Sequence, residues 1–310
     1  MDANIRKPLI QELPSLRKVW ETVFASADGA IFFDYYFDSN LSLVAAQDDV
    51  LATGYLLPAG NLIYGENCEN TIPCAMIYAI ATLPEYRRRG YAAAIVQNLI
   101  TAGRAAGYPA IVLCPSEDSL FKYYSANTEL FDFFFTNEQR YKKIPPESGK
   151  THISKISADE YCKHRRALLK DTPHIDLERR AIEYQRLLCD LFGGGLYRID
   201  SPHGASYAVV EKQAGSTLIK ELLTPDGGEA DALSAVAAKF PASEYIVRTP
   251  AQNHPHINNA KQNPNESSIR RFGMLATPLA GLYCSTPTQN NVPGNCVPKN
   301  YTPWYGLAFD

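Results

Sequence analysis

The stretch that most constrains the fold is residues 74–99. It opens with an apolar run of strand character, which must end before Pro84 because proline has no N–H for a strand ladder. Three arginines and Gly90 come next, and then an alanine-rich run. If that run is helical, one face of the helix contains Ala92, Ile95, Val96 and Leu99. The stretch therefore predicts a strand, a basic turn and a helix.

Such a turn can bind an anion. The first N–H groups of a helix have no partner within the helix, and the helix dipole makes that end positive. Gly90 lets a phosphate approach the backbone closely, and Arg87, Arg88 and Arg89 add positive charge. A solvated basic turn before an ordinary surface helix is the alternative interpretation of these residues.

The spacing Arg87-x-x-Gly90-x-Ala92 after a strand resembles the acyl-CoA signature of the GNAT N-acetyltransferases. That signature reads (Gln/Arg)-x-x-Gly-x-(Gly/Ala), and this chain fills every position. The resemblance implies acetyl-CoA as the co-substrate. It also implies that the pyrophosphate is held by the turn amides of Arg88, Arg89, Gly90, Tyr91 and Ala92. The strand backbone at Ile80, Ala81 and Thr82 would hold the pantetheine arm.

Composition sets outer limits on function. The chain has 310 residues, enough for two domains, and its net charge of −3 gives no reason to expect nucleic acid or an anionic membrane as a partner. No apolar run is long enough for a membrane helix, and the N-terminus lacks a secretory apolar segment. The seven cysteines are scattered and odd in number, which predicts free thiols, no metal site and a cytoplasmic location. The sequence leaves a homodimer open.

The first half predicts a mixed sheet of the α/β (α+β) class. Residues 41–64 form an expected hairpin, and residues 110–114 form a buried strand parallel to 76–81, which gives a βαβ unit. Residues 132–150 are expected to complete this sheet. An aromatic helix over 30–37 is mostly core by composition. In the GNAT pattern it borders the acceptor cleft, so the resemblance implies that one or two of Phe33, Tyr35 and Tyr36 line the cleft. Tyr78, on the strand over 76–81, is a further candidate cleft residue.

A second helix supplies the candidate acid. Pro115 and two early carboxylates favour a helix start, and Tyr123 and Tyr124 follow in it. In the resembling family the matching helix ends in a Phe/Tyr-Tyr pair whose second tyrosine protonates the departing CoA thiolate. The resemblance thus implies Tyr124 as general acid and Tyr123 as its cofactor-side neighbour. The Gly-Phe that usually follows is absent here, so packing is the alternative role for both rings.

The second half repeats the order of the first. A breaker-rich segment near 145–149 is followed by two helices, three strand-like runs, a helix and a strand. The second of these helices is expected over 175–192. At the turn equivalent to the RRRG turn, residues 224–231 contain three acidic residues and no arginine, which would repel a pyrophosphate. The interpretation is a duplicated GNAT fold. Residues 1–148 bind acetyl-CoA, and 149–310 form a degenerate copy.

The predicted function is transfer of an acetyl group from acetyl-CoA to a primary amine by direct attack. A strand amide would stabilise the carbonyl oxygen and Tyr124 would protonate the thiolate. The base stays open among a water, Tyr78 and the C-terminal carboxylate of Asp310. Some two-domain members of the resembling family, the Eis-like acetyltransferases, use their chain terminus in this role. An acyl-enzyme on Cys114 is disfavoured because no histidine lies nearby in sequence. The alternative is a CoA-binding sensor without turnover. The acceptor is not specified by the sequence.

Overall fold

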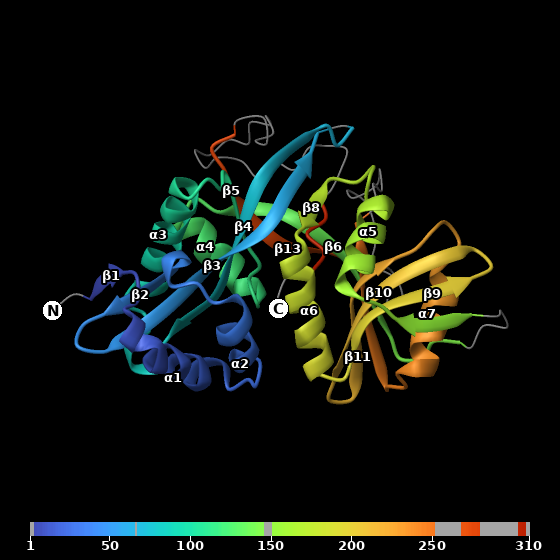
Figure 1. The fold of residues 1–310 in the computed structure, drawn as a ribbon, viewed down its shortest axis with the longest axis horizontal. Helices are drawn as coiled ribbons and strands as arrows, with labels where there is room; N and C mark the ends of the chain where they lie inside the picture. The colour runs from blue at the N-terminus through green and yellow to red at the C-terminus, as the bar shows by residue number, and fades with distance from the viewer. Residues whose placement is uncertain (1–2, 66, 146–150, 252–267, 280–302, 308–310) are drawn as a thin grey trace.

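The computed structural model describes residues 3–65, 67–145, 151–251, 268–279 and 303–307. They form two lobes side by side, the first built mainly from the N-terminal half and the second mainly from the C-terminal half (Figure 1). Helix α6 (Arg179–Leu191) lies between the lobes in this view. Both halves combine helices and strands, and the sheet contains parallel and antiparallel pairs, so the α/β prediction with a mixed sheet is confirmed.

One sheet runs through both lobes. Its strand order is β1-β2-β3-β4-β5-β13-β6-β12-β11-β10-β9-β7, and β8 pairs with β3 off this path. The first half supplies β1 (Asn4–Arg6), β2 (Ser42–Ala46), β3 (Val50–Tyr64), β4 (Asn70–Thr82), β5 (Ala110–Leu113) and β6 (Phe131–Tyr141). The second supplies β7 (His152–Lys155), β8 (His174–Leu177), β9 (Gly195–Ser201), β10 (Gly204–Gln213), β11 (Ser216–Leu223), β12 (Glu244–Pro250) and β13 (Ser268–Ala276).

The two halves exchange strands at the centre of this sheet. β6 follows β5 in the sequence, yet it pairs with β12, and β13 lies between β5 and β6. The expectation that residues 132–150 complete the first sheet is therefore corrected: the neighbour of β5 comes from the second half. Met274 and Leu275 of β13 are fully buried, on the two faces of the first lobe's core.

Helices cover both faces of the first lobe. α3 (Tyr91–Ala105) and α4 (Asp118–Asn127) share one buried apolar cluster with β4 and β5. α1 (Leu13–Phe24) buries Leu16, Val19 and Trp20 on the opposite face, as its spacing predicts. After α2 (Gly29–Ile31), the chain continues as a π-helix over Phe32–Tyr36, a rare form that often lies near functional sites.

The second half keeps the predicted order of two helices, three strands, a helix and a strand, and it adds the strands β7, β8 and β13. α5 (Ala158–Leu168) begins at Ser157, whose hydroxyl accepts from the Glu160 amide, and α7 (Glu229–Lys239) connects the parallel strands β11 and β12. The helix expected over 175–192 begins later, at Arg179. Its first residues form β8, because they pair with the free edge of β3 from Gly60↔Leu177 to Ile63↔His174.

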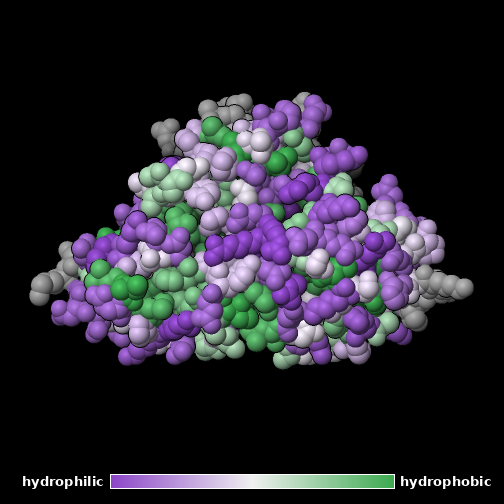
Figure 2. Space-filling view, viewed as in Figure 1, coloured by the Kyte–Doolittle hydropathy of each residue, from purple (hydrophilic) through white to green (hydrophobic). Residues whose placement is uncertain are grey.

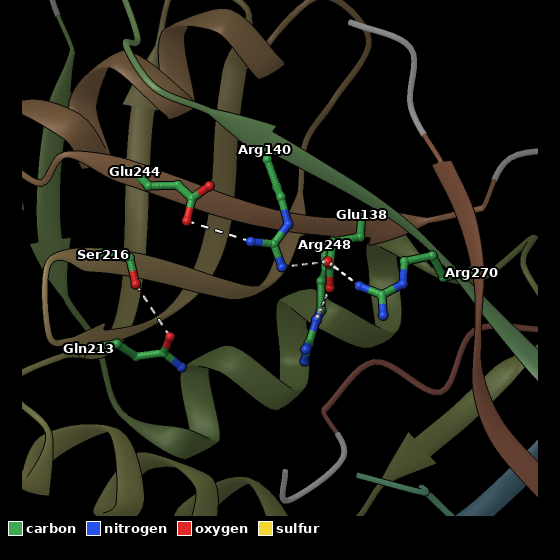
Figure 3. Close-up of polar contacts among 7 residues, drawn as sticks. All are labelled: Glu138, Arg140, Gln213, Ser216, Glu244, Arg248 and Arg270. Carbon is green, nitrogen blue, oxygen red and sulfur yellow. Dashed lines mark hydrogen bonds and ion pairs between the residues drawn. The ribbon is translucent and has the colours of Figure 1, made fainter. Parts of the chain in front are cut away.

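Polar contacts join β6 of the first half to β12 and β13 of the second half. Glu138 of β6 accepts from Arg248 of β12 at 3.2 Å and also from Arg270 of β13, while Arg140 lies on its other side (Figure 3). Burial alone would raise the pKa of Glu138, but the charges of Arg248 and Arg270 outweigh it and the pKa is lowered.

The face of the molecule that Figure 2 shows is mostly hydrophilic, with separated apolar patches.

Candidate active site

The two parallel strands β4 and β5 separate at their C-terminal ends. They pair from Cys74↔Ala110 to Ile77↔Leu113, and β4 then continues to Thr82 without β5 beside it. This leaves backbone groups of β4 open toward the gap between the strands. Separated parallel strands of this kind provide a slot for an extended ligand that can hydrogen-bond to the strand backbone.

A bulge lies where β4 leaves β5. Thr53 pairs with Ala81 and Tyr55 with Tyr78, so Ala79 and Ile80 together face the single residue Gly54. Ala79 has a φ of 48°, the left-handed region, which turns its peptide out of the regular ladder. Gly54 is required here, because a Cβ would lie 2.6 Å from the Ile80 side chain. The bulge thus aims a backbone group at the slot.

A cavity of about 360 Å³ opens at this bulge. β4 and β5 form its floor, and the loop after β5 and helix α4 form one wall. The loop between α1 and α2 forms the other. Its lining residues are Phe24, Ser26, Asp28, Met76, Ile77, Tyr78, Ala79, Ile80, Leu113, Cys114, Pro115, Ser116, Leu120 and Tyr124.

Tyr124 brings a proton donor to this cavity. Its side chain is buried, and burial together with the neighbouring Tyr123 raises its pKa well above the usual value for a phenol. The phenol therefore stays protonated across the neutral range. The ring of Tyr123 packs against it with centroids 5.3 Å apart. Cys114 also reaches the cavity, but its thiol donates to the Phe272 carbonyl at 2.9 Å.

The basic turn follows directly after β4. Arg87 Nε donates to the Thr82 carbonyl at 3.2 Å, which ties the turn to the end of the strand. Arg88 and Gly90 have φ values of 62° and 82°, and Gly90 is the residue before α3. A Cβ at Gly90 would meet nothing within 4 Å, so the turn faces open space. The exposed arginines and the first amides of α3 form a site that suits phosphate groups.

The second lobe has the same bulge with different chemistry. Val209 pairs with Glu221 and Val210 with Ile219, so Lys220 of β11 is the extra residue. Its ammonium is buried and lies 3.5 Å from Glu211. The following helix, α7, begins at Glu229 and carries carboxylates in its first turn. Negative charge at this helix start opposes phosphate binding.

The structure brings some of the predicted site residues together and separates others. Tyr78, Ile80 and Tyr124 line the cavity, while Ala81 and Thr82 continue the strand to the turn. Tyr91 and Tyr123 pack at the edge of the α3–α4 cluster. Two predicted cleft residues are core residues and do not line the cavity. They are Phe33, whose ring lies 5.7 Å from Trp20, and Tyr36, whose hydroxyl donates to the Pro58 carbonyl at 2.6 Å. Asp310 falls outside the described residues.

Several lining residues had no sequence prediction as site residues. Phe24 is the last residue of α1, and Ser26 and Asp28 lie in the loop that follows it. The only available signal was the position of this loop, just before the aromatic segment that borders the acceptor side in the resembling family. Leu113, Ser116 and Leu120 enter because β5 ends where β4 continues.

A second cavity of about 260 Å³ adjoins the first, sharing Cys114, Pro115 and Ser116 with it. Three arginines of β12 and β13 line it together with Glu138, Glu117 and Asp118. Positive and negative side chains are thus balanced in this cavity. Among the described residues, no cluster of three or more His, Cys, Asp or Glu side chains can hold a metal ion. The described helices are all too short or too polar to cross a bilayer.

Comparison with known families agrees with this geometry. Residues 4–126 match the model of the acetyltransferase (GNAT) domain. Residues 4–126 therefore carry the sequence features of this domain. This match contains the bulge, the basic turn and Tyr124. A search of curated proteins by sequence finds no match to the chain.

Solved structures extend the GNAT likeness to both lobes. A GCN5-related N-acetyltransferase from Anabaena variabilis matches with a TM-score of 0.64 at 15% identity, over 88% of this chain and 72% of that one. A probable N-acyltransferase from Enterococcus faecalis matches with a TM-score of 0.61 at 14% identity, over 89% and 72%. A tandem GNAT protein from the clavulanic acid biosynthesis pathway matches with a TM-score of 0.53 at 16% identity, over 88% and 98%. At these identities the likeness concerns the fold.

Proposed function

We propose that this protein is an N-acetyltransferase that moves the acetyl group of acetyl-CoA to a primary amine by direct attack. The observation that carries the proposal is one cavity that joins three parts: the slot after Ile77, the bulge at Ala79 and the phenol of Tyr124. Residues 1–148 would bind acetyl-CoA. Residues 149–310 would be a GNAT-like domain without a CoA turn, although the strand exchange makes the two interdependent.

The basic turn would bind the pyrophosphate. The turn from Arg88 to Ala92 precedes and begins a helix of 15 residues and has open space beside Gly90, and Arg87 and Arg89 lie on the surface next to it. Helix N-termini favour anions through both their unpaired N–H groups and the dipole. The pantetheine arm would then run along Ile80–Thr82 into the slot. The acetyl group would reach the cavity at the bulge.

Chemistry at the bulge needs a donor for the carbonyl oxygen and a proton for the thiolate. A backbone N–H near Ala79 would serve the oxygen, because the bulge leaves it outside the regular ladder. The Tyr124 phenol would give its proton to the sulfur as the C–S bond breaks. Its raised pKa keeps that proton in place until the thiolate forms.

The binding half of the proposal is tested with Arg87→Glu/Arg89→Glu. The affinity for acetyl-CoA, measured by calorimetry, should fall by at least about tenfold, because the site changes from positive to negative. This loss of affinity should be larger at low salt, where charges are screened less. Lys163→Glu/Lys170→Glu is the matched control. It makes the same charge change at exposed residues of α5 and the turn after it, and it should bind as the unaltered protein does.

The catalytic half is tested with Tyr124→Phe. Thiol release with acetyl-CoA and a panel of amines should lose about 10²-fold in kcat, the value of one general acid, while acetyl-CoA binding is kept. Tyr64→Phe removes a phenol far from the cavity lining and should leave the rate unchanged. If the unaltered protein binds CoA but releases no thiol with any amine, it is a CoA-binding sensor and the enzymatic proposal is wrong.

A further inference from the structure

The acceptor side of the cavity carries a single formal charge, the carboxylate of Asp28. The lining is otherwise apolar side chains, hydroxyls and one thiol, and the described residues place no lysine, arginine or histidine in it. A carboxylate beside an apolar cavity is costly unless a cation or hydrogen-bond donors face it. An incoming ammonium group would supply that cation.

The fold holds Asp28 at this place. α1 ends at Phe24, and the next residue, Ala25, lies in the left-handed region with a φ of 50°, which ends the helical path before Asp28. Trp20 Nε1 donates to Asp28 Oδ1 at 3.4 Å. Gly29 makes this approach feasible, because a Cβ there would lie 2.7 Å from the same indole nitrogen. The loop is therefore fitted to the Trp20 ring, with Asp28 at the cavity mouth.

The wall next to Asp28 is aromatic. Tyr78 lines the cavity with its ring 5.9 Å from Trp20, and its hydroxyl lies 3.2 Å from that of Tyr184. Phe24, at the end of α1, is exposed and also lines the cavity. Aromatic faces attract cations and pack well against flat apolar groups. The surroundings of Asp28 thus suit an ammonium group attached to an apolar body.

We infer that Asp28 binds and deprotonates the acceptor, and that the acceptor is a primary amine whose body carries no acidic group. This rests on the proposed acetyl transfer. A carboxylate next to the amine would be repelled by Asp28. The three arginines of the neighbouring cavity do not offset this repulsion, because three carboxylates, those of Glu117, Asp118 and Glu138, line the same cavity.

The ammonium gives one proton to the Asp28 carboxylate, which later releases it to solvent. The neutral amine attacks the thioester carbon, a C–N bond forms, and the C–S bond breaks as Tyr124 protonates the sulfur. The nitrogen, now part of an amide, gives its second proton to the Tyr124 oxygen, which restores the phenol. The products are an N-acetyl amine, free CoA thiol and one proton.

The test uses the full-length protein, acetyl-CoA and two probes of similar shape, 2-phenylethylamine and phenylalanine. The unaltered protein should acetylate 2-phenylethylamine with the higher kcat/KM. Asp28→Asn keeps the shape of the side chain but cannot take a proton. It should lose about 10²-fold in kcat/KM for the amine, and the preference over phenylalanine should shrink. Asp28→Glu should recover part of the rate, which a purely structural role for Asp28 would not explain.

Asp34→Asn is the matched control. Asp34 lies on the same segment but is exposed, pairs with Arg17 at 2.7 Å and does not line the cavity. It should leave both rates unchanged. If Asp28→Asn keeps its kcat/KM and its preference, or if phenylalanine is the better probe for the unaltered protein, the inference about Asp28 fails while acetyl transfer stands. If neither probe nor any other amine releases thiol, the proposed function itself fails.

Discussion

Replacing Glu221 by glutamine should be the most destabilising isosteric change in the second lobe. This carboxylate is fully buried on β11. It accepts from Arg165 Nε at 2.9 Å, from the Tyr161 hydroxyl at 2.8 Å and from Trp304 Nε1 at 2.6 Å. The three donors come from α5 and from the segment 303–307, so one side chain fixes both to the sheet.

The expected cost follows from the charge that is left behind. The Arg165 side chain is only 2% exposed, and Glu221 is 0% exposed. Glutamine would keep the shape, but it would leave the guanidinium buried without a counter-charge. Breaking a buried ion pair from one side costs about 3–5 kcal/mol of unfolding free energy. Removing both charges with Arg165→Met/Glu221→Leu should cost less than Glu221→Gln alone, because no uncompensated charge remains.

Urea unfolding, followed by tryptophan fluorescence, measures this directly, since Trp304 is one of the two tryptophans of the chain. Glu183→Gln is the control. It breaks a surface ion pair with Arg186 and should cost less than about 1 kcal/mol. If Glu221→Gln costs no more than this control, or if the double variant is the less stable of the two, the account of a buried, charge-dependent anchor is refuted.

Two further predictions concern stability. Burial, and then the charge of Arg165, lower the pKa of His174 to about 4 from 6.5. The unfolded chain therefore takes up this proton between those pH values. Stability should fall by about 2 kcal/mol between about pH 7 and about pH 5, and His174→Gln should reduce that fall in urea titrations at the two pH values. Gly103→Ala should lower the unfolding free energy by about 1–3 kcal/mol in thermal melts, because its Cβ would lie 2.5 Å from Ile111 Cδ1 and 2.9 Å from Leu56 Cδ2; an unchanged or raised melting temperature would contradict this packing.

Local sequence signals predicted the parts of the site that are local. The strand, the turn around Gly90 and the helix after it form one contiguous unit, and Tyr124 lies on the next helix of the same βαβ region. The order of elements in the second half could also be predicted, because its strand-like and helical runs repeat that unit. Aromatic spacing could not separate core from cavity: Phe33 and Tyr36 pack inside, while Tyr78 reaches the cavity.

The parts that could not be predicted depend on distant segments. Nothing near β5 indicates that its neighbour is β13, because two apolar strands pair according to the tertiary fold and not according to their own residues. Asp28 resembles an ordinary residue at a helix boundary until Trp20 and β4 are seen beside it. The late start of α6 has the same cause, since β8 exists through its pairing with β3.

The exchange of β6 and β13 sets the timing of folding during synthesis. β5 ends at Leu113 and β13 ends at Ala276, so roughly 160 residues must be made before the edge of β5 is covered. At about 5–20 residues per second, the ribosome needs roughly 10–30 s for this segment. An uncovered edge of the apolar strand β5 invites wrong pairing with other chains for that whole interval. The N-terminal half therefore cannot finish folding first, and a nascent chain that stops near residue 148 is a natural target for chaperones.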